Sequence, residues 1–378
     1  MRIFTGARLF DGERFRDDSA LVVEDDRVRA IVAHADRPGG ETVDLAGGVL
    51  APGFVDWQVN GGGGALFNQA PDPQTIRRIV VSHRAYGTTA LLPTVITDAP
   101  DALSAALAAA REAQATIPGA LGVHVEGPFI DARRKGAHPA EWIRPLREAD
   151  AAALIDARAG VMVVTLAPAS ASNEMIARLA RAGIIVSIGH AEASAEEAQA
   201  AFDAGARAAT HLYNAMSQLG HRSPGLVGAA LANPRVYCGF IADGFHVHET
   251  AGRIALRAKG AERIALISDA MPSAAGGPKQ YELHGRRVTQ SGLKLTLEDG
   301  TLAGAAITML DAIRYCVAHL GAPLGDALRM ATLTPAQLLR IEASHGSLRP
   351  GARADLVHLG PDLELFGVWV GGEAVQLE

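Results

Sequence analysis

Four side chains that could bind a metal ion or move protons stand at the ends of separate apolar runs. Glu126 lies in VHVEGP, His190 closes VSIGH, His211 lies in ATHLYNAM and Asp269 lies in LISDAM. One carboxylate and two imidazoles suit Zn²⁺ or a similar divalent ion, with one coordination position open for water. An aspartate at another strand end is then placed to move protons for that water. The pattern predicts metal-assisted hydrolysis if these four groups share one cavity.

Each of these residues also has a purely structural interpretation. Glu126 could form a buried salt bridge, and a single histidine at a strand end is more often a hydrogen-bonded core residue than a ligand. Asp269 could cap a helix, but the following MPSAAGGP does not begin one. Three ligand-type residues at strand ends favour a catalytic metal site, provided that the strands converge. His124 shares a strand face with Glu126 and is interpreted as an interior or supporting residue.

The middle of the chain alternates apolar runs with amphipathic, Ala-rich segments such as SNEMIARLARAG. Continuous apolar runs of this kind are typical of parallel strands that are buried on both faces. The runs are GVLAPGFVDWQV, TTALLPTV, ALGVHVEG, VMVVTLAP, GIIVSIGH, ARAATHLYNAM, VYCGFIADG and RIALISDA. They predict an α/β fold, a (β/α)8 TIM-like barrel, with a doubly wound open sheet as the alternative. The barrel is preferred because it brings every strand end to one mouth.

The two ends of the chain have a different composition from the middle. Residues 1–50 contain short β-type segments with turns such as Asp11-Gly12, and residues 346–378 contain the similar segments ADLVHLG and LELFGVWVGGEAVQL. We therefore expect the two ends to form one small, discontinuous β-sandwich domain. Residues 51–345 would form the barrel domain, interrupted near residues 277–301 by a β-hairpin with the sequence YELHGRRVTQSGLKLTLEDG.

Composition argues against several classes of partner. The net charge of −6 and the lack of Lys/Arg blocks argue against nucleic acid and anionic membrane surfaces. Because no apolar stretch approaches the length of a membrane span and the N-terminus lacks a signal-type apolar region, a cytoplasmic enzyme is expected. Cys238, in a predicted strand, and Cys316, in a predicted helix, are expected to be buried structural thiols.

Two further motifs suggest ligand contacts. DGFHVH places His246 and His248 in an H-x-H pattern, but the glycine before them indicates that the strand has ended, so His246 is interpreted as a substrate contact. Arg222 precedes Ser223 and Pro224, which predict an N-cap and the first residue of a helix. An arginine beside a helix N-terminus suits phosphate, although an exposed arginine without a ligand fits the sequence equally well.

Several long motifs occur together along the chain, in the order PGFVDWQVNGGGG, HVEGPFI, KGAH, SIGHAEAS, THLYNAM, RSPGLVG, ADGFHVH, SDAMPSAAG and GTLAGAAITM. With ADLVHL near the end, this set resembles the N-acetylglucosamine-6-phosphate deacetylases of the amidohydrolase superfamily. The resemblance implies a metal site of Glu126, His190 and His211, with Asp269 as the catalytic acid and base. It also implies substrate contacts at Ala137, His138, Asn214, Ala215, Arg222, His246, Leu302, Ala303 and Gly304.

The chain departs from many amidohydrolases at one place that bears on the metal count. Where they carry H-x-H after the first strand, this chain has Gln58 and Asn60, and neutral amides are poor Zn²⁺ ligands. We therefore expect one divalent ion per subunit, with Zn²⁺ preferred over Fe²⁺, Co²⁺ or Mn²⁺. In the family, the arginine that matches Arg222 contacts the sugar phosphate of the neighbouring subunit, which implies a homodimer.

The resemblance predicts hydrolysis of the N-acetyl group of N-acetylglucosamine 6-phosphate to glucosamine 6-phosphate and acetate, in amino-sugar catabolism. Asp269 would exchange protons with water and with the departing amine, while His138 would polarise the acyl carbonyl. A deacetylase of N-acetylgalactosamine 6-phosphate or of another amide is the alternative, because no residue can be tied to reading the epimer. A non-catalytic barrel scaffold is a more distant alternative, opposed by the intact set of four residues.

Overall fold

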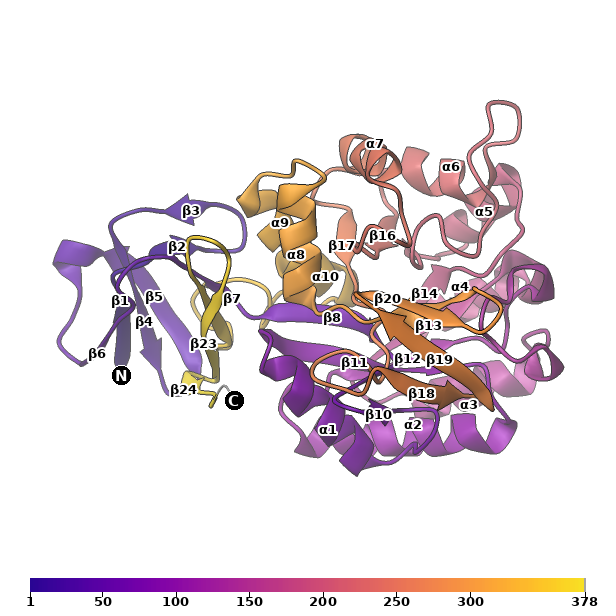
Figure 1. Cartoon of the computed structure of the whole chain (residues 1–378), viewed down its shortest axis with the longest axis horizontal. Helices are drawn as coiled ribbons and strands as arrows, with labels where there is room; N and C mark the ends of the chain where they lie inside the picture. Colours follow the sequence, from indigo (N-terminus) through magenta and orange to yellow (C-terminus); the bar gives the residue numbers. More distant parts are fainter. Residues whose placement is uncertain (377–378) are drawn as a thin grey trace.

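The chain folds into a barrel with a smaller β-rich part beside it (Figure 1). The computed structural model describes residues 1–376, so Leu377 and Glu378, the last two residues of the expected small domain, lie outside the described residues. Strands from both terminal regions of the described chain belong to the β-rich part, which lies away from strands β18–β20 (Figure 1). The exact division of the chain into two domains stays a prediction.

Eight parallel strands form the barrel sheet in sequential order, as predicted, and this order is not that of a doubly wound sheet. They are β8 (Phe54–Val59), β11 (Thr88–Ile96), β12 (Gly122–Glu126), β13 (Val161–Leu166), β14 (Ile185–Ile188), β15 (Ala208–Ala209), β16 (Tyr237–Phe240) and β17 (Ile264–Leu266). The ring closes between the segment after β17 and β8, where Asp269 N donates to Gln58 O at 3.0 Å and Asn60 N donates to Ala270 O at 2.9 Å.

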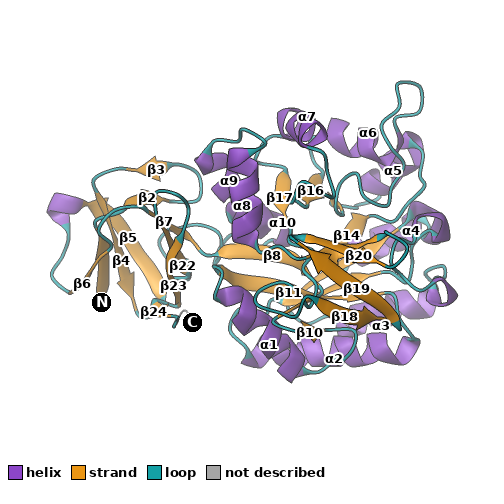
Figure 2. Cartoon of the chain, in the orientation of Figure 1, coloured by secondary structure: helices purple, strands orange, loops and turns teal. Residues whose placement is uncertain are grey.

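Helices alternate with these strands and cover the outside of the barrel (Figure 2). They are α1 (Pro73–Arg84), α2 (Pro100–Thr116), α3 (Glu148–Ala157), α4 (Asn173–Arg181), α5 (Ala195–Asp203), α6 (Gly225–Ala232), α7 (Glu249–Lys259), α8 (Met309–Ala318), α9 (Leu324–Ala331) and α10 (Leu333–Leu339). Ser172 caps α4 and Ser194 caps α5, each accepting a backbone N–H three residues on. Within residues 1–376, no helix is long and apolar enough to cross a membrane.

Two sheets make up the smaller part, and strands from both ends of the chain pair within one of them. The four-stranded sheet contains β5 (Arg27–Ala33), β4 (Ser19–Glu24), β1 (Arg2–Thr5) and β6 (Glu41–Asp44). The six-stranded sheet contains β24 (Glu373–Ala374), β23 (Leu365–Val370), β22 (Leu356–Leu359), β7 (Val49–Pro52), β2 (Arg8–Phe10) and β3 (Phe15–Arg16). Phe4, Leu21, Leu50 and Leu356 belong to one buried cluster that joins the two sheets.

A four-stranded antiparallel sheet follows β17, where a hairpin was expected. Its strands are β18 (Gln280–Leu283), β19 (Arg286–Ser291), β20 (Lys294–Leu297) and β21 (Leu302–Ala305). Leu283, Val288 and Leu295 pack with the barrel residues Ile96 and Met271 in one apolar cluster. We call this sheet the insertion sheet, and the cluster holds it against the barrel mouth. A smaller pair of strands, β9 (Gly61–Gly62) and β10 (Ala65–Leu66), lies after β8.

The expected cap of α6 by Ser223 is wrong. The helix begins at Gly225, and its first N–H groups bind Ser217 instead: Leu226 N donates to Ser217 Oγ at 2.8 Å and Val227 N donates to Ser217 O at 3.2 Å. Gly225 has a φ of 60°, a left-handed conformation that glycine adopts without strain. These two N–H groups are therefore bound within the protein and do not offer the phosphate site considered from the sequence.

Truncating Leu50 should destabilise the β-rich part without changing the chemistry of the barrel. Leu50 is fully buried in β7, and Leu→Ala changes at such positions cost about 2–5 kcal/mol because a cavity remains. We expect the Leu50→Ala variant to lower the free energy of unfolding by this amount in guanidinium denaturation. Leu293→Ala, at a position 39% exposed, is the control and should change it by less than about 0.5 kcal/mol. Equal small effects would contradict the assigned core.

Candidate active site

The structure brings the four predicted residues to one rim of the barrel. Glu126 is the last residue of β12, while His190, His211 and Asp269 follow β14, β15 and β17 within a few residues. These three have left-handed φ angles of 47°, 32° and 48°. Residues other than glycine rarely adopt this region, and each costs about 1–3 kcal/mol where the surrounding structure imposes it. Each chain segment thus turns sharply after its strand, and the side chain lines the barrel mouth.

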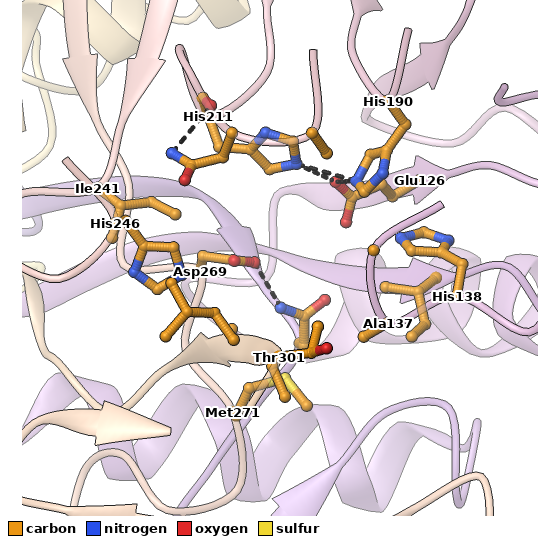
Figure 3. A pocket seen from close by; sticks show the side chains of 18 of the residues that line it. Glu126, Ala137, His138, His190, His211, Ile241, His246, Asp269, Met271 and Thr301 are labelled. Carbon is orange, nitrogen blue, oxygen red and sulfur yellow. Dashed lines mark hydrogen bonds and ion pairs between the residues drawn. The ribbon is translucent and has the colours of Figure 1, made fainter. Parts of the chain in front are cut away.

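Glu126, His190 and His211 form a compact cluster of donor atoms (Figure 3). Oε1 of Glu126 lies 3.2 Å from Nε2 of His190 and 3.0 Å from Nε2 of His211, and the two nitrogens are 3.0 Å apart. Donor atoms around a tetrahedral ion with bonds of about 2.0–2.1 Å lie about 3.3 Å from one another. The three atoms therefore have nearly the spacing of one face of such a coordination shell, and their chemistry suits a divalent ion.

The hydrogen bond made by Nδ1 of His190 determines whether Nε2 of the same ring can bind a metal ion. Nδ1 donates to the backbone carbonyl of Arg134 at 2.8 Å, because a carbonyl oxygen can only accept. Nε2 consequently keeps its lone pair and faces Glu126, which is the arrangement found in metal-binding histidines. Arg134 is itself paired with Glu192, which lies two residues after His190. The orientation of this ring is therefore set by the loop between β12 and α3.

His138 competes with His211 for a place in the cluster, since donor atoms of Glu126, His138 and His190 lie within 4.8 Å of one another. Its hydrogen bonds favour a different role. The backbone N–H of Thr97 points at Nδ1 of His138 at 3.3 Å, and the Thr97 hydroxyl lies 2.7 Å from the same atom. Because the N–H can only donate, Nδ1 accepts and the proton sits on Nε2. Burial, together with the neighbouring imidazole of His190, holds the pKa of His138 well below its usual range. A neutral ring with an Nε2–H suits a carbonyl oxygen better than a cation.

Gln58 and Asn60 hold the carboxylate of Asp269 in place. Oδ1 of Asp269 accepts from Nδ2 of Asn60 at 2.8 Å and from Nε2 of Gln58 at 3.1 Å, and the same Nε2 donates to Oε1 of Glu126 at 3.1 Å. Burial raises the pKa of Asp269 to about 6, and the charge of Glu126 adds to the rise. Although burial opposes ionisation of Glu126, the two imidazoles beside it hold its pKa well below the usual range. The pKa values of two neighbouring acids are thus shifted in opposite directions, as acid–base chemistry requires.

A cavity of about 400 Å³ opens beside this cluster and contains almost all the predicted contacts. Those that line it are Ala137, His138, Asn214, Ala215, His246, Leu302, Ala303 and Gly304. Nδ1 of His246 donates to Asp243 at 2.6 Å, which directs the other face of the ring into the cavity. His248 instead caps α7, so the H-x-H pattern is not a metal site. Arg222 does not line the cavity and is exposed on the segment between β15 and α6.

The sequence did not reveal how the loop that carries His138 is held. Nη2 of Arg286, in β19 of the insertion sheet, donates to the carbonyl oxygen of Ala137 at 2.7 Å. Thr97, just after β11, binds the ring of His138. Leu283 of the insertion sheet also lines the cavity. The hairpin signal located the insertion but gave no indication that one of its arginines reaches the active site, because that contact depends on the tertiary fold.

The geometry agrees with comparisons to known proteins. The family model described as the Amidohydrolase family matches residues 49–375. The chain belongs to this family. This amidohydrolase is 38% identical to an N-acetylgalactosamine-6-phosphate deacetylase of Shewanella sp. (strain ANA-3), over 99% of the chain and 95% of the relative. It is 34% identical to an N-acetylglucosamine-6-phosphate deacetylase of Haemophilus influenzae, over 94% of each. The crystal structure of the N-acetylglucosamine-6-phosphate deacetylase from Pasteurella multocida superposes with a TM-score of 0.96 at 34% identity, covering 99% of both chains.

Membership of this family confirms the resemblance seen in the motifs and the barrel fold inferred from the apolar runs. The amidohydrolases are metal-dependent, and the cluster at the barrel mouth provides a candidate site for the ion. The chain is a hydrolase. A non-catalytic scaffold, the more distant alternative, does not fit these observations.

Removing the Arg286 side chain should loosen the loop that carries His138. An Arg286→Met variant loses the hydrogen bond to Ala137 O, and one such bond contributes about 0.5–1.5 kcal/mol. Backbone amides of residues 135–142 should then exchange with deuterium up to about tenfold faster. Arg287→Met is the matched control, because Arg287 is the exposed neighbour on the same strand. The contact would have no positioning role if both variants exchanged like the parent protein.

Proposed function

We propose that this amidohydrolase removes the N-acetyl group of N-acetylglucosamine 6-phosphate, giving glucosamine 6-phosphate and acetate in amino-sugar catabolism. The observation that carries the proposal is one cavity that contains a three-donor cluster, an aspartate whose pKa is raised to about 6, and a neutral imidazole donor. Full-length similarity to deacetylases of phosphorylated amino sugars supports this substrate class.

Glu126, His190 and His211 are the proposed ligands of one divalent ion per subunit, Zn²⁺ by preference, with Fe²⁺, Co²⁺ and Mn²⁺ as the alternatives for this donor set. When bound, the ion would supply Lewis-acid chemistry and lower the pKa of water toward neutrality. The hydrogen bonds of Gln58 and Asn60 support a single ion, because both amides direct their N–H groups at carboxylates. Neither amide nitrogen has a lone pair to offer a second ion.

The proposed chemistry uses two further side chains. Asp269 takes the proton of the attacking water on the carboxylate oxygen that does not bind the amides, and it then returns this proton to the nitrogen of the departing amine. Nε2–H of His138 donates to the acyl oxygen as negative charge develops there, a contribution of about 2.7–4 kcal/mol in comparable sites. The carbon–nitrogen bond breaks, water supplies the new carboxyl oxygen, and acetate and the amine leave.

The rest of the cavity supports binding of a phosphorylated sugar. Asn214, Ala215 and His246 line it. Figure 3 shows His246 across the cavity from His138, and Asp243 orients the His246 ring. Arg222 lies outside the cavity of its own chain, and we propose that it reaches the phosphate in the neighbouring subunit of a homodimer. Leu302, Ala303 and Gly304 would contact the sugar ring from the insertion sheet. A cytoplasmic location completes the proposal.

N-acetylgalactosamine 6-phosphate is the second candidate substrate. It is favoured by the relative from Shewanella sp. (strain ANA-3), which is 38% identical over 99% of this chain and is named as the deacetylase of that sugar. The two sugars differ only in the orientation of one hydroxyl group. Since the amide and the phosphate are shared, either epimer fits the same metal cluster, and the mechanism is unchanged.

Acetate release from four N-acetyl sugars tests the function and the epimer together. The zinc-loaded protein should hydrolyse N-acetylglucosamine and N-acetylgalactosamine 6-phosphates far faster than the unphosphorylated forms, because binding uses the phosphate. A chelator should abolish activity, and elemental analysis should find one ion per chain. The faster epimer names the substrate. Equal activity on unphosphorylated sugars would contradict the proposed phosphate site. Absence of acetate release from all four sugars would overturn the proposed function.

A mixture of two variants, each nearly inactive at a low substrate concentration, tests the roles of Asp269 and Arg222. Asp269→Asn should bind metal and sugar but hydrolyse very slowly, since the amide cannot accept the proton. Arg222→Ala should lose affinity for the phosphorylated sugar only. In mixed dimers, the Asp269→Asn subunit supplies its Arg222 to the other site, so an equal mixture should regain about one quarter of the parental activity. Arg257→Ala, an exposed arginine on α7, is the control for Arg222. Failure of the mixture to recover would contradict the shared site.

A further inference from the structure

A second buried aspartate lies on the strand next to Asp269, outside the cavity. Asp56, in β8, is fully buried and does not line the site. Its Oδ2 accepts the hydroxyl of Ser268 at 2.5 Å and the backbone N–H of Ser268 at 3.2 Å, while Oδ1 accepts the N–H of Gln58 at 3.2 Å. A buried carboxylate without partners is costly, and this one directs its hydrogen bonds at the residue just before Asp269.

Ser268 extends this contact to the other side of Asp269. Its hydroxyl oxygen accepts the backbone N–H of Ala270 at 3.2 Å, so the Ser268 side chain connects Asp56 to the residue that follows the acid. Asp269 N itself donates to Gln58 O at 3.0 Å, which fixes the middle of the turn to β8. The backbone at Asp269 is therefore held at three consecutive residues by groups that do not reach the cavity.

The backbone conformation at Asp269 explains why hydrogen bonds to its neighbours are needed. Asp269 has a φ of 48°, a left-handed angle that costs energy for a residue other than glycine. If the neighbouring residues were free, the backbone could relax toward an ordinary angle and swing the carboxylate away from Asn60 and Gln58. Acid–base catalysis depends on this placement, since an error of about 1 Å can lower the rate about 100-fold.

We propose that Asp56 and Ser268 form a positioning pair that holds the catalytic carboxylate of Asp269 at its working angle. The pair rests on the proposed function, because it acts through the acid–base role of Asp269. It touches neither the substrate cavity nor the metal ligands. Its loss should therefore slow the chemical step while leaving sugar binding and metal binding in place.

Ser268→Ala and Ser187→Ala form a matched pair of variants. Both serines are fully buried in the barrel wall and bind another side chain, and Ser187 Oγ lies 2.6 Å from Thr210 Oγ1. Ser268→Ala should lower kcat between about 10- and 100-fold with KM within twofold of the parent and an unchanged zinc content. Ser187→Ala should keep kcat within about threefold, although both changes lower the melting temperature through the lost buried hydrogen bond. Asp56→Asn, which is nearly isosteric, should give a loss of the same kind.

The outcomes separate the proposed pair from a structural role. A Ser268→Ala enzyme with the kcat of Ser187→Ala would overturn the proposal, as would loss of zinc or a rise in KM in place of the fall in kcat. If Ser268→Ala does not fold, Asp56→Asn decides by the same criteria. A crystal structure of the variant without substrate provides an independent test. The proposed positioning role would be contradicted if Oδ1 of Asp269 still accepted a hydrogen bond from Nδ2 of Asn60. Acetate release by the parent enzyme tests the proposed function separately, because only the ratio of variant to parent tests the pair.

Discussion

The pairing between β8 and the segment after β17 closes the barrel, and the catalytic acid and its hydrogen-bond partners lie on these two paired segments. Gln58, Asn60 and Asp56 come from β8 and the residue after it, while Ser268 and Asp269 come from the facing turn. Backbone bonds at 3.0 and 2.9 Å join the two segments, and side-chain bonds on either side of the backbone reinforce them. An open sheet would leave the acid and its amide partners on opposite edges, so the closed ring is a requirement of the site and not only of the fold.

Electrostatic differences between two neighbouring acids give the site its asymmetry. Glu126 and Asp269 share the amide of Gln58 as a donor, but only Glu126 lies within hydrogen-bonding distance of two imidazoles. One carboxyl group is consequently held as an anion, while burial keeps the other close to the point at which it gains a proton. The two amides contribute by satisfying negative charge without adding a cation, which leaves the second acid free to exchange protons.

The sequence predicted the alternating strands and helices of the barrel, but it did not predict the side-chain contacts between residues that are far apart in the chain. The barrel and the residues at its rim could be predicted, because parallel strands that alternate with helices must end on one side. The contact between Arg286 and Ala137 joins residues 149 apart, and that between Asp56 and Ser268 joins residues 212 apart. No local pattern encodes such pairs. The cap at Ser223 was wrong for a different reason, since Ser217, in the loop before α6, binds the start of that helix. The domain boundaries and the roles of the site residues stay predictions.

If Arg222 completes the site of a neighbouring chain, as proposed, ligand binding and subunit association become linked equilibria. The N–H groups at the start of α6 are already bound by Ser217, so the nearby helix terminus cannot replace the guanidinium as an anion contact. On the proposed arrangement, each site is complete only when another chain supplies this residue. The apparent affinity for the ligand would then depend on protein concentration, because dilution separates the chains and weakens binding. By linkage, the ligand would stabilise the dimer by the same free energy. The preference of the enzyme for phosphorylated over unphosphorylated sugars would therefore rise with enzyme concentration.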